Sequence, residues 1–156
     1  MWWRQAQKQF NQDSRAGNKR KFKQLVARGT VPGIIPYSGS DPVGWCAVQP
    51  REEFVRLEES RILAPVDERP IWSVTCLFVA KESRGDGVST ALLKAAAKHV
   101  KKSGGRIVEG YPVEPSGRQP AAWLFTGIAS AYVKAGFTEV ARRSPTRPIM
   151  RFHLAK

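Results

Sequence analysis

A glycine-rich turn between two apolar segments has the clearest chemical meaning in this sequence of 156 residues. It spans residues 81–87 and contains Gly85 and Gly87 on either side of Asp86. Glycines let successive backbone N–H groups point at one spot, and the dipole of a following helix favours an anion there. A diphosphate would suit such a site, although a tight strand-to-helix connection would use the same residues. The spacing excludes a Walker loop and a three-glycine dinucleotide fingerprint.

The segments on both sides of the turn are predicted to position it. Residues 72–80 are apolar on both sides, which is typical of a central strand covered on both faces. Residues 88–102 repeat apolar side chains at helical spacing until Gly104 and Gly105 stop the helix. Residues 106–111 follow as another strand pattern. The unit therefore predicts two parallel strands joined by a right-handed helical crossover.

The remaining residues predict further elements of a single domain, residues 1–156. Asn18 is a candidate cap for a helix that repeats apolar residues up to Val26 and ends at Gly29. The other predicted elements are a hairpin from 33–37 and 42–48, a short surface helix in 51–63, a helix in 128–135, and antiparallel strands in 137–142 and 149–154. We therefore expect an α/β fold, a mixed central sheet with helices on both faces.

Two motifs on these elements resemble the GNAT acyltransferase superfamily. The turn is similar to its acetyl-CoA loop, Gln/Arg-x-x-Gly-x-Gly/Ala, with Arg84, Gly87 and Ser89 at the three defined positions. Residues 132–137, Tyr-Val-Lys-Ala-Gly-Phe, are similar to the Tyr-x-x-x-Gly-Phe ending of the helix that borders the CoA thiol. The order of elements agrees over nearly the whole chain, and residues 109–112 and 136–151 look like one bacterial subgroup.

The resemblance implies transfer of an acetyl or other acyl group from acetyl-CoA to an amine. A backbone N–H near Phe78 or Val79 would bond the thioester oxygen, and this strand would pair with the pantetheine arm. Tyr132 is the candidate general acid for the leaving sulfur, a half-buried aromatic being the alternative. Glu109 is the candidate base, an ion-paired structural carboxylate being the alternative. The expected acetyl-CoA site comprises Leu77, Phe78, Val79, Arg84, Gly85, Asp86, Gly87, Val88 and Ser89.

Three departures from the family pattern bear on this expectation. The chain opens in helix-like sequence where the family has a strand, so either that strand is dispensable or the native chain begins upstream. Asp86 brings a carboxylate close to the expected diphosphate, and Ser89 adds a hydroxyl where Gly or Ala is usual. These changes motivate one alternative function, a catalytically inactive GNAT domain that binds a ligand.

The net charge of +13, from 26 basic and 13 acidic residues, predicts attraction to anions. Eight of the basic side chains and one acid lie in the first thirty residues. This motivates a second alternative, a GNAT-fold transferase with an aminoacyl-tRNA as acyl donor or acceptor. Otherwise the acceptor is expected to be an amine of a small molecule or a protein. Five tryptophans are either core anchors or the walls of an acceptor site: Trp2, Trp3, Trp45, Trp72 and Trp123.

Other residue types limit the cell compartment and the cofactors. Cys46 and Cys76 lie in apolar runs and are expected to be reduced core thiols. Neither His99 nor His153 has the neighbours of a metal site, so no metal is expected. No apolar run approaches the ~20 residues of a membrane span, and no signal peptide is evident. We expect a cytoplasmic protein that does not contact membranes, and pairing of late strands in a homodimer stays open.

Overall fold

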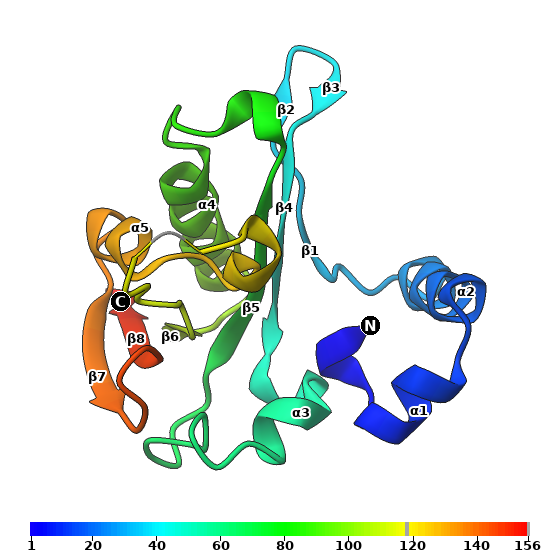
Figure 1. Ribbon diagram of the computed structural model, residues 1–156, viewed down its shortest axis with the longest axis horizontal. Helices are drawn as coiled ribbons and strands as arrows, with labels where there is room; N and C mark the ends of the chain where they lie inside the picture. Colours follow the sequence, from blue (N-terminus) through cyan, green and yellow to red (C-terminus); the bar gives the residue numbers. More distant parts are fainter. Residues whose placement is uncertain (118, 156) are drawn as a thin grey trace.

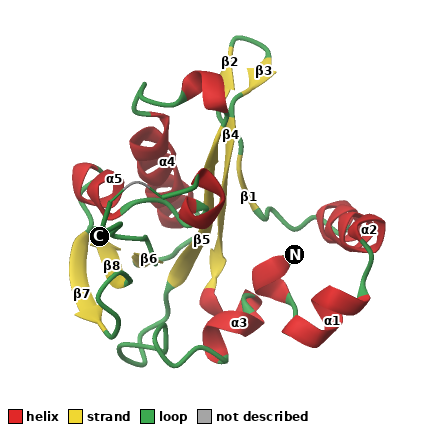
Figure 2. Cartoon of the chain, viewed as in Figure 1, coloured by secondary structure: helices red, strands yellow, loops and turns green. Residues whose placement is uncertain are grey.

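The computed structural model describes residues 1–117 and 119–155, which form a mixed sheet between helices (Figures 1 and 2). The strands of its six-stranded sheet follow the order β1-β4-β5-β6-β8-β7. Strands β5 and β6 are parallel, and the other neighbours are antiparallel. Their bounds are β1 (Gly33–Ile34), β4 (Gly44–Pro50), β5 (Trp72–Val79), β6 (Ile107–Gly110), β7 (Thr138–Arg142) and β8 (Pro148–His153). The expected mixed α/β fold is confirmed.

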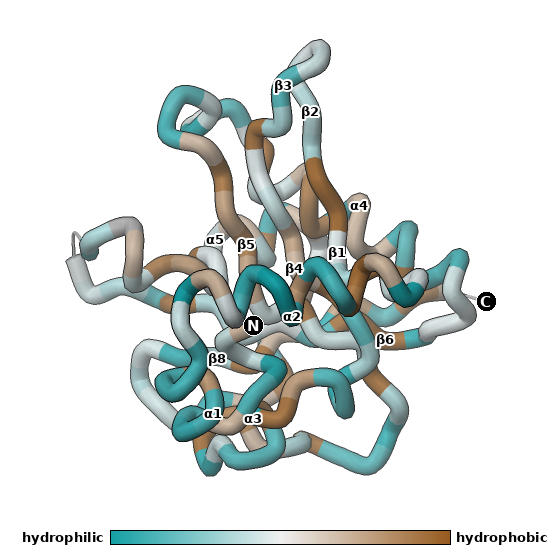
Figure 3. Tube along the Cα trace, turned by 90° about the vertical axis from the view of Figure 1, so that its right-hand side faces the viewer, coloured by the Kyte–Doolittle hydropathy of each residue, from teal (hydrophilic) through white to brown (hydrophobic). Residues whose placement is uncertain are grey.

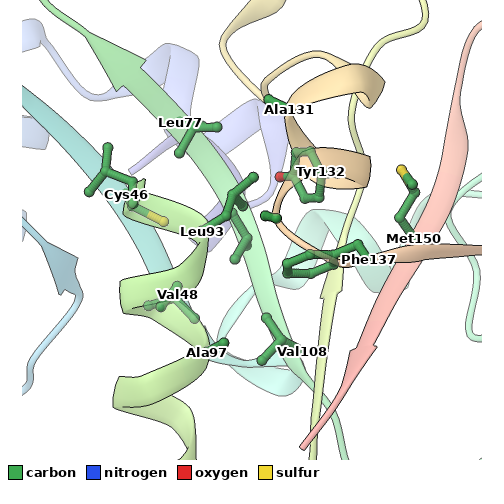
Figure 4. Close-up of a cluster of buried hydrophobic side chains, with 14 of the residues drawn as sticks. Cys46, Val48, Leu77, Leu93, Ala97, Val108, Ala131, Tyr132, Phe137 and Met150 are labelled. Carbon is green, nitrogen blue, oxygen red and sulfur yellow. The ribbon is translucent and has the colours of Figure 1, made fainter. Parts of the chain in front are cut away.

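Helix α4 (Val88–Lys102) makes the crossover between β5 and β6 and packs on one face of the sheet together with α5 (Ala129–Lys134). Its apolar side chains recur at helical spacing, so one stripe of the helix is buried. These side chains are Leu92, Leu93, Ala96, Ala97 and Val100. They belong to the main hydrophobic cluster, which Figure 4 shows between α4, α5 and the central strands.

The N-terminal segments lie on the other side of the sheet (Figure 1). They comprise η1 (Trp2–Arg4), α1 (Gln7–Gln12) and α2 (Arg15–Ala27), and η1 contacts α3 (Val55–Glu58). Helix α2 has no buried residue and is largely hydrophilic along its trace (Figure 3). A second hydrophobic cluster includes Phe54 and Leu57 and packs against Trp3. The N-terminal layer is therefore attached to the sheet through η1, the segment around α3, and Phe22 of α2, whose ring packs edge-on against Trp45 of β4.

A bulge in β5 opens the sheet beside this strand. Ala47 of β4 lies opposite Cys76 and Val48 lies opposite Val74, which leaves Thr75 as an extra residue. Strand β5 pairs with β6 only from Trp72 to Val74. Beyond the bulge, the Leu77 N–H donates to the Phe125 carbonyl at 2.7 Å instead of to a strand. The carboxyl end of β5 therefore has no neighbouring strand on its β6 side, and we call this side its free edge.

Local expectations and structure differ at several element ends. Ser14, not Asn18, caps α2, its hydroxyl accepting from the Gly17 N–H at 2.9 Å. Asn18 lies inside the helix, because the spacing of apolar residues does not show at which residue the first turn begins. The hairpin forms, with a tip of β2 (Tyr37–Ser38) and β3 (Asp41–Pro42). Residues 51–63 contain only η2 (Arg51–Glu53) and α3, while the other short helices are η3 (Lys81–Ser83) and η4 (Ala121–Leu124).

Candidate functional site

A pocket of about 570 Å³ lies at the free end of β5, where the strand, the glycine-rich turn and the start of α4 meet. We call it the donor pocket. Residues between 119 and 131 form its other wall. Of the expected cofactor residues, eight line it: Leu77, Phe78, Val79, Arg84, Gly85, Gly87, Val88 and Ser89. Asp86 is absent from the lining and exposed, so its carboxylate faces solvent.

The turn presents free backbone donors to the donor pocket. Gly85 and Gly87 have φ of +97° and +75°, which side chains rarely allow, and a Cβ at either would meet nothing within 4 Å. Glycine is therefore needed here for backbone conformation and not for space. The first intrahelical bond of α4 runs from the Ala91 N–H to Gly87, so the N–H groups of the first turn remain available. In the described part of the chain, no side chain caps them.

Arg84 holds the turn against β5 through its side chain. Its Nε donates to the Val79 carbonyl at 3.0 Å. This bond fixes the turn over the end of the strand. Arg84 therefore positions the loop in addition to giving it a positive charge. The sequence had suggested only that Arg84 occupies a place in the acetyl-CoA loop.

Alternation along β5 separates the two candidate N–H donors for a thioester. The Leu77 N–H points away from β4, toward Phe125. The Val79 carbonyl also points away from β4, because it accepts from Arg84. Phe78 pairs with Trp45 of β4, and the next N–H on that side, from Ala80, donates to the Val43 carbonyl. Since successive residues alternate sides, the Val79 N–H faces the donor pocket, whereas the Phe78 amide belongs to the β4 ladder.

Tyr132 lies in the hydrophobic core between α5 and β5 (Figure 4). Its side chain is fully buried and its hydroxyl donates to the Thr126 carbonyl at 3.0 Å. Burial raises the pKa of Tyr132 well above its usual value, so the hydroxyl keeps its proton. It is not part of the donor-pocket lining in the described residues. However, Thr126 adjoins Phe125, whose carbonyl covers the Leu77 N–H.

Glu109 lies away from the donor pocket, in a buried ion network. It is 0% exposed, its Oε2 accepts from Arg151 Nε at 2.6 Å, and its Oε1 accepts from the Tyr111 hydroxyl at 2.7 Å. Arg51 Nη1 donates to the same Oε1 at 3.4 Å. The register pairs Glu109 with Ser73, six residues before Val79, which is roughly 20 Å along a strand. The structure thus does not bring Glu109 to the cleft as the sequence predicted, because β6 leaves β5 before the cleft begins.

The tryptophans have separate environments. Trp2, Trp3 and Trp45 line a second pocket of about 140 Å³, which adjoins Phe125. Trp72 packs edge-on against His99, with ring centroids 5.8 Å apart, and Trp123 is 70% exposed. Sequence reasoning missed the importance of Phe125, which lines both pockets, because no motif marks it.

The described residues contain neither a cluster of side chains suited to a metal ion nor a helix long and apolar enough to cross a membrane. Cys46 is buried and Cys76 is partly buried, and both are free thiols. Burial raises the pKa of each thiol, which disfavours the reactive thiolate.

Comparisons with solved structures agree with this architecture. The chain is similar to a GNAT-family protein from Desulfovibrio desulfuricans (TM-score 0.57, 18% identity, 90% of this chain and 80% of that chain). It is also similar to the ribosomal-protein-alanine N-acetyltransferase of Brucella melitensis (TM-score 0.57, 15% identity, 88% and 77%). A third similar structure is yncA from Salmonella typhimurium with acetyl-CoA (TM-score 0.57, 13% identity, 89% and 73%). At these identities the likeness establishes the fold.

The sequence itself establishes the family. The model of the Acetyltransferase (GNAT) family matches residues 1–125, most of the chain. The chain therefore belongs to the GNAT acetyltransferase family. No curated protein matches the sequence.

Proposed function

We propose that this protein is an N-acetyltransferase that moves an acetyl group from acetyl-CoA to an amine. The observation that carries the proposal is the donor pocket, where free N–H groups of α4 and the free edge of β5 open into one cavity. Its residues fit the co-substrate chemically. The N–H groups of the turn and the first turn of α4 suit the diphosphate, and the edge of β5 suits an extended pantetheine arm.

Acetyl-CoA supplies a thioester, the activated acetyl group. In the transfer, a bond forms between the amine nitrogen and the acetyl carbon while the carbon–sulfur bond breaks. The amine loses a proton and the leaving sulfur gains one. A backbone donor aimed at the thioester oxygen stabilises the charge that develops there, and removing such a donor typically costs about 3 kcal/mol. We assign this role to the Val79 N–H, which faces the pocket.

Two further donors point at the segment that borders the donor pocket. The Leu77 N–H and the Tyr132 hydroxyl bond the carbonyls of consecutive residues, Phe125 and Thr126. A shift of this segment would free both donors together. We assign Leu77 to the pantetheine arm and Tyr132 to protonation of the sulfur. We give Glu109 no part in the transfer, because two guanidinium groups and a phenol already surround it.

The test combines binding with turnover. Acetyl-CoA should raise the melting temperature of the protein in proportion to the logarithm of its concentration. Release of free thiol from acetyl-CoA should then depend on an added amine, with a gain of 42 Da on that amine by mass spectrometry as the product check. Binding without thiol release for any amine would favour the inactive ligand-binding alternative. Absence of binding would overturn the proposal.

The aminoacyl-tRNA alternative rests on the exposed basic side chains of α2. Arg15, Lys19, Arg20 and Lys23 are exposed on a helix that buries none of its residues. Such a surface attracts phosphates regardless of sequence, and its affinity falls steeply with salt. Acetyl transfer from acetyl-CoA that is unaffected by tRNA would exclude this alternative.

A further inference from the structure

The second pocket has the size and walls of a site for one ring. We call it the aromatic pocket. Its volume of about 140 Å³ is close to the ~150 Å³ cavity that holds a benzene molecule in another protein. Six of the residues that line it are aromatic: Trp2, Trp3, Phe22, Trp45, Phe54 and Phe125. They come from η1, α2, β4 and two loops, so the pocket exists only in the folded chain.

A buried cation lines this pocket without a hydrogen-bond acceptor. The Arg4 side chain is 7% exposed, and neither Nη1 nor Nη2 has a partner among the described residues. The nearest carboxylate, Glu53 Oε2, is 3.9 Å from Nη1 and half exposed. The guanidinium lies 4.7 Å from the centre of the Phe54 ring. Buried guanidinium donors are normally satisfied, because an unpaired buried charge is costly.

A second donor in the same pocket is also unpaired. The indole Nε1 of Trp3 is buried and has no acceptor in the described part of the chain. Burial lowers the pKa of Arg4, and the half-exposed Glu53 carboxylate offsets this shift only in part. The pocket therefore joins an aromatic enclosure to donors that a carboxylate would satisfy.

The aromatic pocket adjoins the donor pocket across β5. Consecutive residues Cys76 and Leu77 line the aromatic and donor pockets, respectively, because side chains alternate across a sheet. Phe125 lines both pockets. A ligand in the aromatic pocket would consequently lie close to the free edge of β5.

We propose that the aromatic pocket binds the acetyl acceptor, and that this acceptor is a small amine carrying both a carboxylate and an apolar or aromatic group of about one ring. Arg4 pairs with the carboxylate, and the aromatic walls enclose the ring. The amine points past Phe125 toward the donor pocket. This inference rests on the proposed acetyl transfer and names the substrate class for it.

Three matched probes separate the two recognition elements. L-phenylalanine carries ring, amine and carboxylate, 2-phenylethylamine lacks the carboxylate, and 3-phenylpropionate lacks the amine. Quenching of tryptophan fluorescence reports binding without acetyl-CoA, since Trp3 and Trp45 line the pocket. Both carboxylates should bind at least about tenfold more tightly than 2-phenylethylamine, as a charge-assisted hydrogen bond would give.

Arg4→Met tests the cation and Arg56→Met is its control. Arg56 is a neighbouring cation, 3.6 Å from the centre of the Trp2 ring, but it does not line the pocket. In Arg4→Met, we expect the carboxylate probes to bind less than about threefold more tightly than 2-phenylethylamine. In Arg56→Met, the full preference for the carboxylate probes should remain. Arg4→Met should melt no lower than the wild type, because it removes a buried charge whose nearest carboxylate is 3.9 Å away and half exposed. A large loss of melting temperature together with an unchanged preference would mean that Arg4 is only structural and would overturn the inference.

Turnover separates this inference from the proposed function. Thiol release with L-phenylalanine but not with 3-phenylpropionate, lost in Arg4→Met, supports both. Rapid thiol release with 2-phenylethylamine, unchanged in Arg4→Met, overturns the inference and leaves acetyl transfer intact. Binding of L-phenylalanine without thiol release overturns the acceptor role, and the proposed transfer itself fails only if no added amine releases thiol. Equal binding of all three probes, or no binding of either carboxylate, overturns the inference alone.

Discussion

Tyr132 occupies the expected position of the sequence motif, but whether its hydroxyl can act as an acid depends on its surroundings in the fold. Its ring packs edge-on against Phe137, with centroids 5.1 Å apart, and its hydroxyl is one hydrogen bond from the segment beside the donor pocket. The sequence identified the residue. The hydroxyl is buried and donates to the Thr126 carbonyl, so this hydrogen bond must break before the hydroxyl can donate to a leaving sulfur.

Tyr132→Phe tests the acid role. The variant should lower kcat by about 10²–10⁴, the usual contribution of a general acid. It should leave acetyl-CoA affinity within a few fold and reduce stability by only about 1 kcal/mol for one lost hydrogen bond. Steady-state kinetics and urea unfolding measure the two effects. Tyr111→Phe, which removes a buried hydroxyl from the Glu109 network, is the matched control, and equal kcat values in both variants would refute the acid role.

Glu109→Gln tests the buried ion network. The change leaves Arg51 and Arg151 without the carboxylate they share, and breaking a buried pair costs about 3–5 kcal/mol. We expect the lower end, about 3 kcal/mol, because Asp67 still pairs with Arg151 and Glu58 with Arg51. Urea unfolding gives the cost, and kcat below the melting transition should stay within about twofold.

The matched control for Glu109 is Glu58→Gln. Glu58 is about half exposed, so losing its ion pair should cost less than about 1 kcal/mol. A Glu109→Gln protein with unchanged stability and a large loss of kcat would restore Glu109 as a catalytic base.

At the scale of elements, the bulge in β5 and the turn before α4 together create the donor pocket. The bulge ends the pairing with β6 at Val74, and the turn ends at Gly87, whose left-handed conformation starts the helix. The bulge could not be predicted from the sequence, because residues 72–80 have the pattern of one continuous apolar strand. The turn was predictable, because two glycines within three residues at a strand-to-helix junction indicate positive φ.

Gly87→Ala tests the turn, with Gly39→Ala as its control. Both glycines have positive φ, +75° and +60°, and neither Cβ would meet an atom within 4 Å. Each variant should therefore lose about 1 kcal/mol of stability from backbone strain. Only Gly87→Ala should weaken acetyl-CoA binding, by about tenfold or more, because it displaces N–H groups that would bind the diphosphate. Calorimetric titration measures the affinity, and equal affinities in both variants would contradict the proposed diphosphate site.

At the scale of the whole molecule, the basic residues behind the charge of +13 divide into a buried group and an exposed group. Inside, Arg51 and Arg151 neutralise Glu109, and Arg4 lines the aromatic pocket. Outside, α2 carries exposed basic residues that the donor pocket does not use. The net charge is therefore not evidence for acetyl-CoA binding, and the role of the exposed basic residues of α2 needs a separate test.

Replacing Arg15, Lys19 and Lys23 by Gln tests the surface of α2. These side chains are exposed, so stability should change by less than about 0.5 kcal/mol. The acetyl-CoA proposal predicts an unchanged KM for acetyl-CoA and unchanged kcat. The tRNA alternative predicts weaker tRNA binding and a slope of log affinity against log salt that is shallower by about two to three. Filter binding at several salt concentrations measures the slope, and a large loss of acetyl-CoA turnover would contradict the proposed separation of the two surfaces.

The sequence by itself determined the central strand, helix α4, the glycine-rich turn and the mixed sheet, because these depend on local periodicity and on glycine conformation. It also located eight of the residues that line the donor pocket. The tertiary structure decided the rest. Glu109 meets Arg51 and Arg151 across long separations in sequence, and Arg4 meets Phe54 in the same way. Such contacts follow from strand register and layer packing, which a bulge at Thr75 changes and which no local pattern encodes.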